Sequence, residues 1–230
     1  MRRLLIWAWG ITWRIMACIP CVQIAISKHP RRSSLRRFPR EAGVGVNQDL
    51  ISITPMEGQL IRRAEPCDAE IISEIYNWYI LNTTATFETE AIDRLAMRRR
   101  ILETLTTHDW LVAEIAGRIV GYAYYGVFRS RPAYAHTAES TIYLSEGSIG
   151  KGLGTRLYSA LIHSAAEKGF RELIGVIALP NAASVRLHAK LEFREAGRLQ
   201  AVGRKFGSYI DVGLWQRPTS LPVPNSQVSR

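Results

Sequence analysis

The chain is poor in cysteine, with only Cys18, Cys21 and Cys67 among its 230 residues. Three thiols cannot build the paired framework that stabilises small secreted domains, so we expect a reducing compartment and predict a cytoplasmic protein. Cys18 and Cys21 have C-x-x-C spacing, but neither a second pair nor a neighbouring histidine completes a set of zinc ligands. The sequence therefore predicts no metal site.

Acidic residues are scarce only in the first quarter of the chain. Residues 1–55 contain nine basic and two acidic residues, whereas residues 56–230 contain 21 basic and 18 acidic residues, for a formal charge of +10 overall. Nucleic-acid-binding domains concentrate positive charge on the folded body, because phosphate contacts supply much of their affinity. Since the excess lies in the N-terminal segment, we expect no nucleic-acid partner for the body.

A long uninterrupted apolar run is also missing. Residues 4–26 are mostly apolar, but Arg14 interrupts them, and a central arginine costs about 2.5–3.5 kcal/mol on membrane-insertion scales. A membrane anchor and a signal or transit peptide stay open as alternatives. We favour a third interpretation, in which the N-terminal extension is disordered or not part of the true protein, which then starts at Met56. The predicted parts are this extension, a single domain and a disordered proline-containing tail: residues 1–55, 56–217 and 218–230.

No internal repeat occurs, and after Met56 strand-like runs alternate with helix-like runs. Alternating or β-branched runs predict strands, and apolar residues at helical spacing predict helices. The expected strands span 59–64, 110–115, 118–128, 139–144 and 172–179, followed by a closing hairpin over 194–216. The expected helices span 68–81, 91–107, 151–168 and 182–191. We predict an α/β (α+β) domain with a mixed, mostly antiparallel sheet flanked by helices, and we interpret Arg98–Arg100 as a solvated helix face.

A glycine-rich turn lies between the expected strand 139–144 and the helix that follows. It reads Gly150, Lys151, Gly152, Leu153, Gly154 and Thr155. The turn lacks P-loop spacing, and it also lacks the βαβ setting of a dinucleotide-binding fold. Free N–H groups at a helix start can bind phosphate oxygens, although a turn of this kind can also be a tight connection alone. An extended ligand with a pyrophosphate, such as coenzyme A, suits it.

This turn, together with the sequence after it, resembles the acyl-CoA site of the GNAT N-acyltransferase superfamily. The body is most similar to phosphinothricin N-acetyltransferases, a group that is itself like the methionine sulfoximine acetyltransferases. The matching stretches are 75–77 (IYN), 82–90 (NTTATFETE), 110–114 (WLVAE), 121–123 (GYA), 134–143 (YAHTAESTIY), 152–158 (GLGTRLY), 176–188 (VIALPNAASVRLH) and 205–215 (KFGSYIDVGLW). The resemblance covers about residues 59–217 in order and leaves residues 1–55 without a counterpart.

The resemblance implies the GNAT fold and acetyl-CoA as the acyl donor, without a metal. It implies acetylation of the α-amino group of phosphinothricin or a similar small amino acid, such as methionine sulfoximine or methionine sulfone, by direct attack in a ternary complex. Glu139 matches the general base of the family, and His188 is expected near the coenzyme A sulfur as an acid or hydrogen-bond donor. A homodimer is also implied, and so is a role in herbicide detoxification.

The remaining site residues are assigned by the same resemblance. Coenzyme A is expected to contact the turn residues and four more: Tyr143, Leu144, Asn181 and Ser184. The N–H around Leu144 is the expected donor to the thioester carbonyl. The acceptor site is expected to be lined by Phe87, Arg131, Tyr134 and Tyr143, because arginine suits a carboxylate or phosphinate.

Four residues depart from the family pattern: His136, Ile149, Glu192 and Arg204. Ile149 stands where a glutamine or arginine is usual, and Glu192 stands where a glycine usually ends a helix. A non-glycine residue there costs on the order of 1 kcal/mol if its φ is positive. These departures keep two alternatives open, a catalytically silent module that binds acyl-CoA and an N-acetyltransferase for another small amine.

Overall fold

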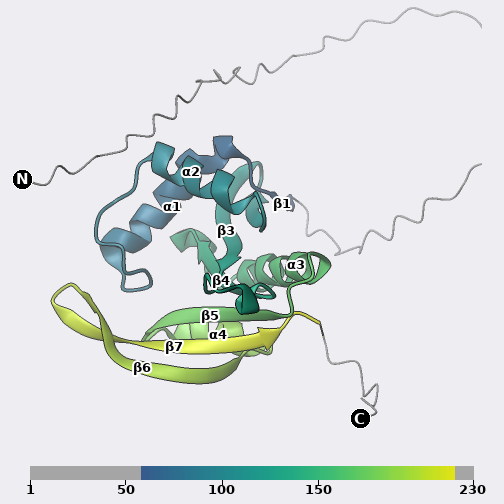
Figure 1. Cartoon of the computed structure of the whole chain (residues 1–230). Coiled ribbons are helices and arrows are strands. Elements are labelled where there is room, and N and C mark those ends of the chain that lie inside the picture. The colour runs from purple at the N-terminus through teal and green to yellow at the C-terminus, as the bar shows by residue number, and fades with distance from the viewer. Residues whose placement is uncertain (1–57, 221–230) are drawn as a thin grey trace, which may run out of the picture. The chain divides into compact units, whose positions relative to one another are not determined.

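The computed structural model of the protein describes residues 58–220, and a seven-stranded sheet in the order β1-β2-β3-β4-β5-β7-β6 lies at its centre (Figure 1). The strands are β1 (Gln59–Arg63), β2 (Trp110–Ile115), β3 (Arg118–Val127), β4 (Thr137–Leu144), β5 (Glu172–Leu179), β6 (Arg194–Lys205) and β7 (Ser208–Pro218). Neighbouring strands pair antiparallel except β4 and β5, which pair in parallel. The prediction of a mixed, mostly antiparallel sheet is confirmed.

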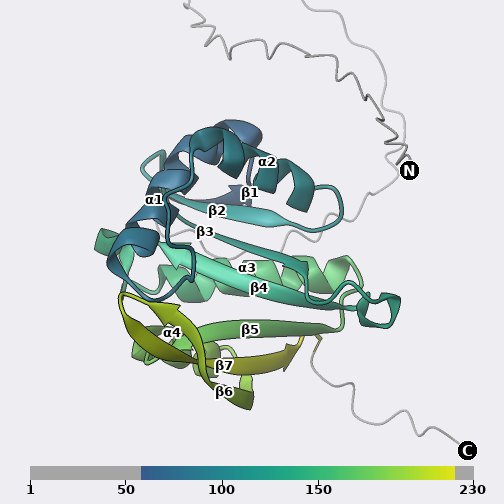
Figure 2. The ribbon, with the colours of Figure 1, turned by 60° about the vertical axis from the view of Figure 1, so that its left-hand side comes forward.

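Two pairs of helices cover the two faces of this sheet (Figure 2). They are α1 (Ala69–Asn82), α2 (Arg94–Thr104), α3 (Leu153–Glu167) and α4 (Ala182–Lys190), with 3-10 turns at Pro66–Asp68, Pro132–Tyr134 and Glu146–Ser148. Helix α2 begins later than the expected residue 91, because the Asp93 side chain caps it by accepting from the N–H of Ala96 at 2.6 Å. The predicted strands and helices are otherwise found within a few residues.

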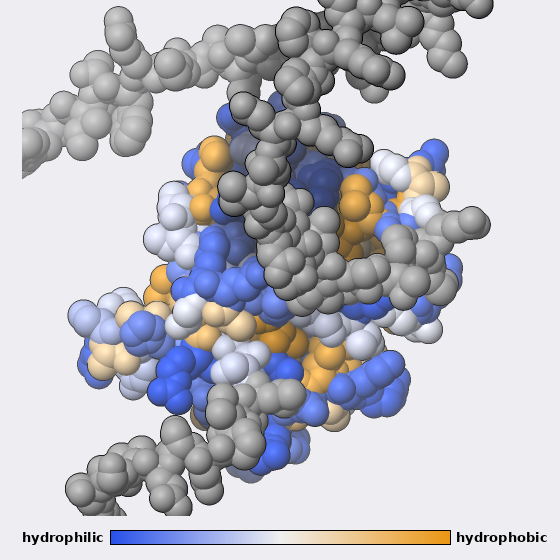
Figure 3. All heavy atoms as spheres, turned by 90° about the vertical axis from the view of Figure 1, so that its right-hand side faces the viewer, coloured by the Kyte–Doolittle hydropathy of each residue, from blue (hydrophilic) through white to orange (hydrophobic). Residues whose placement is uncertain are grey.

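Each face has its own core because side chains alternate across a strand. On one face, α1 and α2 pack on residues such as Val112 and Tyr122, whereas α3 packs on Ala113 and Ala123 of the opposite face. Where Figure 3 shows residues in colour, hydrophilic ones predominate, with smaller hydrophobic patches between them. The described residues thus bury their apolar side chains in two layers around one sheet.

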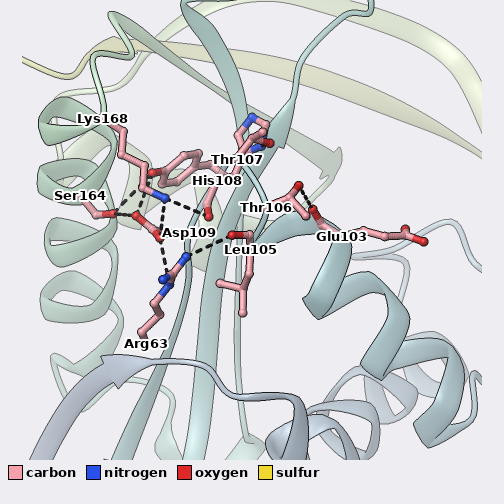
Figure 4. Close-up of polar contacts among 10 residues, drawn as sticks. Arg63, Glu103, Leu105, Thr106, Thr107, His108, Asp109, Ser164 and Lys168 are labelled. Carbon is pink, nitrogen blue, oxygen red and sulfur yellow. Dashed lines mark hydrogen bonds and ion pairs between the residues drawn. The ribbon is translucent and has the colours of Figure 1, made fainter. Parts of the chain in front are cut away.

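A buried carboxylate, Asp109, joins several elements at one end of the sheet (Figure 4). It accepts hydrogen bonds from Lys168 Nζ at 2.8 Å, Ser164 Oγ at 2.5 Å and the Tyr125 hydroxyl at 3.2 Å. Arg63 Nε also lies 3.2 Å from it. Burial by itself raises the pKa of Asp109, but these donors outweigh burial and hold the pKa below its ordinary value. Asp109 therefore anchors β1, β3 and α3 beside the start of β2.

At the other end of the sheet, β4 and β5 separate. Their parallel pairing covers only Thr137 to Ser140 on β4 and Glu172 to Gly175 on β5. Beyond that point β4 stays paired with β3 as far as Leu144, and β5 stays paired with β7. We call this opening the β4–β5 split; it exposes backbone groups of both strands that the sheet leaves without ladder partners.

Some expectations fall beyond the described residues. The extension 1–55, its Cys18 and Cys21, and the apolar stretch 4–26 lie outside them, as do residues 221–230. Strand β7 includes Pro218, and the buried Thr219 donates to the carbonyl of Phe170 at 2.6 Å, so packing continues past residue 217. Between residues 58 and 220, no helix is long and apolar enough to cross a membrane.

Candidate active site

Glu139 lies on β4, on the face of the sheet that α1 and α2 cover. Thr141 and Tyr143 share this face because side chains alternate along a strand. Glu139 is half-buried, and its carboxylate forms no hydrogen bond or ion pair with another residue in the range 58–220. Burial raises the pKa of Glu139, because nothing nearby compensates for the lost solvation of the carboxylate. A half-buried carboxylate without a partner is suited to accept a proton from a bound molecule.

The N–H of Leu144 points into the β4–β5 split. The N–H of Ser145 donates to the Val120 carbonyl at 2.8 Å, so it points toward β3. In an antiparallel ladder the direction alternates from residue to residue, so the N–H groups of Ile142 and Leu144 point away from β3. The carbonyl of Leu144 accepts from the Tyr79 hydroxyl at 2.7 Å, which fixes the end of the strand.

The glycine-rich turn leads directly into α3. Gly150 and Gly152 have φ values of +82° and +75°, which explains the need for glycine at both positions. The N–H groups of residues 150–155 form no hydrogen bond with another described residue, and the first bond of the helix runs from Arg156 N to Gly152 O. Successive free N–H groups at the positive end of a helix form a binding surface for an anion.

Helices α3 and α4 begin at the same edge of the sheet because they follow the parallel strands β4 and β5. Contacts confirm the proximity, since a Cβ built on Gly154 would lie 3.3 Å from the side chain of Leu144 and 3.5 Å from that of Leu187. Asn181 caps α4 by accepting from the N–H of Ser184 at 3.0 Å. The structure therefore gathers Leu144, the glycine-rich turn, Asn181 and Ser184 around one edge of the split.

His188 is buried on α4, with 3% of its surface exposed. Its Nδ1 lies 2.8 Å from the Ser184 carbonyl, and its Nε2 lies 3.1 Å from the Tyr158 hydroxyl. Burial lowers the pKa of His188, so the ring is neutral. Both ring nitrogens are thus engaged within the protein, and a role as proton donor to coenzyme A stays a prediction.

The four expected acceptor residues fall into two groups. Tyr143 packs against Tyr76 and Tyr79 of α1, with ring centroids 5.2 and 4.8 Å apart. Phe87, in the α1–α2 loop, packs over Gly203 of β6 so closely that a Cβ there would lie 2.2 Å from its ring. Arg131 and Tyr134 instead line a small cavity in the β3–β4 connection, at the opposite end of the sheet in Figure 2. A single chain does not bring all four together.

The contacts of two basic side chains, Arg100 and Lys205, were not predicted from the sequence. Arg100 does not lie on a purely solvated face, because it forms a 2.6 Å ion pair with Glu88 and lines a cavity beside Tyr124. Lys205 is buried and donates to the Thr86 carbonyl at 2.8 Å, so it holds the loop that carries Phe87. Arg100 lies 12 residues from Glu88 along the chain and Lys205 lies 119 residues from Thr86, so neither contact follows from local periodicity. The run of β-branched and aromatic residues at 83–87 is the one signal in the sequence that this loop is packed.

The residues that depart from the family pattern have defined surroundings. Glu192 has a φ of +63°, so the condition for its expected cost is met. Ile149 is 46% exposed beside the turn and offers no polar group there. His136 is exposed, and its carbonyl accepts from the N–H of Arg171 at 2.8 Å. Arg204 lies over the ring of Tyr209, 5.8 Å from its centroid.

Within residues 58–220 no group of histidine, cysteine, aspartate and glutamate side chains is arranged to hold a metal ion. Comparison with known proteins gives the class to which this fold and site belong. The family model described as "Acetyltransferase (GNAT) domain" matches residues 61–214. The chain belongs to the GNAT acetyltransferase family.

Individual relatives narrow the comparison. The chain is 40% identical over 164 residues to the phosphinothricin N-acetyltransferase of Streptomyces viridochromogenes, a match that covers 71% of this chain and 90% of the relative. It is 35% identical to the L-methionine sulfoximine/L-methionine sulfone acetyltransferase of Pseudomonas aeruginosa, with 68% and 92% covered. A solved phosphinothricin acetyltransferase from Sinorhizobium meliloti, in complex with acetyl-CoA, superposes with a TM-score of 0.68 at 36% identity, covering 70% of this chain and 88% of that one.

Proposed function

We propose that this protein transfers the acetyl group of acetyl-CoA to the α-amino group of a small amino acid such as phosphinothricin, methionine sulfoximine or methionine sulfone. The observation that carries the proposal is Glu139, a half-buried carboxylate without a partner, on the strand that borders the β4–β5 split. The names of the relatives support the acceptor class. The few cysteines and the exposed free thiol of Cys67 support the cytoplasm as the place of action.

The donor side of the site suits coenzyme A. The free N–H groups of residues 150–155 would bind the pyrophosphate, and the exposed edges of β4 and β5 would pair with the amides of the pantetheine arm. Ser184 and the amide group of Asn181 lie at the start of α4 beside this path. The acetyl group would then lie in the split, within reach of the N–H of Leu144.

The reaction needs one proton acceptor and one oxyanion donor. Glu139 takes a proton from the acceptor's ammonium group, directly or through a water, and leaves a nucleophilic amine. The amine nitrogen forms a bond to the thioester carbon, and the carbonyl oxygen becomes anionic while the N–H of Leu144 donates to it. The carbon–sulfur bond then breaks, the new amide nitrogen loses its second proton, and the departing thiolate takes up one proton to leave as free coenzyme A, while Glu139 returns its proton to solvent.

The proposal includes a homodimer. The α1–α2 loop and the end of β4, which carry Phe87 and Tyr143, lie away from the β3–β4 connection, which carries Arg131 and Tyr134 (Figure 2). One copy therefore offers only part of the expected acceptor site at each place. The guanidinium of Arg131 forms no hydrogen bond or ion pair with another residue between 58 and 220, so it is free to bind a carboxylate or phosphinate. A second copy that brings its β3–β4 connection to this chain's Phe87 would complete the site.

Thiol release from acetyl-CoA tests the function. We expect release with phosphinothricin, methionine sulfoximine or methionine sulfone and little with methionine, because the tetrahedral oxygens are recognised. Glu139→Gln should lower kcat at least 100-fold, the lower end of what general-base catalysis contributes. Glu195→Gln, a change of an exposed strand glutamate, is the matched control and should retain full activity.

Other outcomes would identify the alternatives. Binding of acetyl-CoA without release for any acceptor would contradict the enzyme and point to an acyl-CoA-binding module. Release with an unrelated amine, but not with these amino acids, would correct the acceptor class while leaving Glu139 in its role.

A further inference from the structure

A buried chain of hydrogen bonds crosses the fold at the last parallel pair, Ser140 and Gly175, where the β4–β5 split begins. Ser140 Oγ lies 2.8 Å from the Tyr158 hydroxyl, and this hydroxyl lies 3.1 Å from Nε2 of His188. The chain ends at the Ser184 carbonyl, 2.8 Å from Nδ1 of His188. The side chains of Ser140, Tyr158 and His188 are at most 4% exposed, so no solvent competes for these bonds. The chain links β4, α3 and α4.

The partners determine the direction of every hydrogen bond. The Ser184 carbonyl can only accept, so Nδ1 of His188 carries the proton of the neutral ring and Nε2 is left as an acceptor. The Tyr158 hydroxyl therefore donates to Nε2, and the Tyr158 oxygen accepts from Ser140 at 2.8 Å, since the Ile174 carbonyl, which also faces Ser140 Oγ, lies farther away at 3.4 Å. In this arrangement the ring has no proton on Nε2 to give to a leaving thiolate.

Gly175 shows how tightly the ring is placed. A Cβ at Gly175 would lie 2.4 Å from Nε2 and 2.7 Å from Cδ2 of His188, closer than real Cβ contacts allow. The imidazole therefore lies directly against the β5 backbone at the last residue that pairs with β4. Tyr158 reaches the paired residue on β4 from the same side, and together the two rings occupy the vertex of the split.

We propose that Ser140, Tyr158 and His188 are positioning residues that fix where β4 separates from β5 and so place the N–H of Leu144 for the thioester carbonyl. This rests on the proposed acetyltransferase function, and it differs from a direct proton-donor role for His188. A displacement of about 1 Å at a reacting group can cost 100-fold in rate, so a fixed vertex matters for catalysis. The bond to Leu144 strengthens as the oxygen becomes anionic, so its misplacement lowers kcat rather than raising KM.

A matched pair of tyrosine variants tests the proposal. Tyr158→Phe and Tyr125→Phe each remove one hydroxyl from a fully buried ring. Tyr125 pairs with Ser140 across β3 and β4, but its hydroxyl bonds to Asp109 and takes no part in the chain from Ser140 to His188. We expect Tyr158→Phe to lower kcat at least tenfold with the acceptor KM within twofold. Tyr125→Phe should lower the melting temperature while leaving kcat within twofold. Equal kcat values for the two variants would overturn the proposal.

Two His188 variants separate positioning from proton donation. The side-chain oxygen of His188→Gln can accept from Tyr158 as Nε2 does, but an amide cannot transfer a proton at neutral pH. His188→Leu can do neither. We expect the glutamine variant to keep at least tenfold more kcat than the leucine variant. An equal and severe loss in both would overturn positioning in favour of an acid.

Amide hydrogen exchange provides a readout that does not depend on turnover. Relative to the wild-type chain, Tyr158→Phe should speed exchange at least tenfold for the amides of Thr141 and Tyr143, which face β3 just beyond the vertex. Tyr125→Phe should leave these two amides unchanged. Unchanged exchange in Tyr158→Phe would overturn the proposal even if the enzyme is active. A wild-type chain that releases no thiol, yet shows this exchange pattern, would contradict the acetyltransferase function and leave the positioning of Leu144 supported.

Discussion

Replacing Glu192 by glycine should stabilise the protein, because this residue holds a backbone conformation that favours glycine. The N–H of Phe193 donates to the His188 carbonyl and the N–H of Glu192 donates to the Ala189 carbonyl, each at 3.0 Å. This is the bonding pattern of a Schellman motif, in which the residue at position 192 is left-handed. Its φ of +63° confirms the conformation, and a side chain with a Cβ is strained there.

The net gain follows from two opposing contributions. Relief of the left-handed strain is worth about 1 kcal/mol. The glycine variant loses an ion pair in which Glu192 Oε2 lies 3.6 Å from Arg217, but the Glu192 side chain is 67% exposed. Such exposed pairs contribute about 0.5 kcal/mol or less. The free energy of unfolding should therefore rise by about 0.5–1 kcal/mol, which corresponds to a melting temperature about 1–4 °C higher for a domain of this size.

Urea and thermal unfolding of the full chain, followed by circular dichroism, measure this change. Ala189→Gly is the matched control, since it introduces the same residue into the exposed last turn of α4. Glycine costs up to about 1 kcal/mol in helical conformation, so the control should lose stability. If Glu192→Gly is no more stable than the wild type while Ala189→Gly loses stability as expected, residue 192 stores no such strain and the reasoning is refuted.

Three further predictions concern charged groups. Because burial raises the pKa of Glu139, ionising this carboxylate costs stability as the pH rises through that pKa. The Glu139→Gln variant should therefore melt at a higher temperature than the wild type near pH 7, and the difference should vanish in acid. In the wild-type enzyme, the acidic limb of the pH profile of kcat/KM should lie above the ordinary glutamate pKa. Because the pKa of Asp109 is lowered, its stabilisation is present above the ordinary aspartate pKa and is lost as the pH falls from that value through the lowered pKa. Asp109→Asn should therefore cost about 1.5–3 kcal/mol in neutral urea titrations and progressively less as the pH falls below the ordinary aspartate pKa. Lys205 holds the loop that carries Phe87, so Lys205→Met should raise the KM for the acceptor severalfold and leave the KM for acetyl-CoA unchanged. Lys205→Arg should restore part of the loss. Steady-state kinetics with both substrates varied measure the two KM values.

The local pattern of the sequence predicted much of the fold. The expected strands 110–115 and 118–128 match β2 and β3, and the expected strand 139–144 lies within β4. The cost expected at Glu192 rested on backbone geometry that glycine alone adopts freely, and its positive φ is confirmed. These features depend on neighbours within a few residues, which a pattern can report.

Contacts between distant segments could not be predicted in the same way. The ion pair of Arg100 with Glu88 and the burial of His188 against Gly175 depend on how helices dock on the sheet. Lys205 and Thr86 are 119 residues apart along the chain. The periodicity of a sequence predicts which way a side chain points, but it does not predict which distant segment that side chain contacts. The geometry of the site could therefore be described only from the structure.

The two ends of the sheet have different consequences for how the protein can change. Asp109 and its donors hold β1, β3 and α3 together at one end (Figure 4), whereas β4 and β5 share no bonds beyond Ser140 at the other. Substitutions around the split therefore alter few of the contacts on which folding depends. Such an arrangement lets mutation at the open end change how the donor is held while the anchored end preserves the fold.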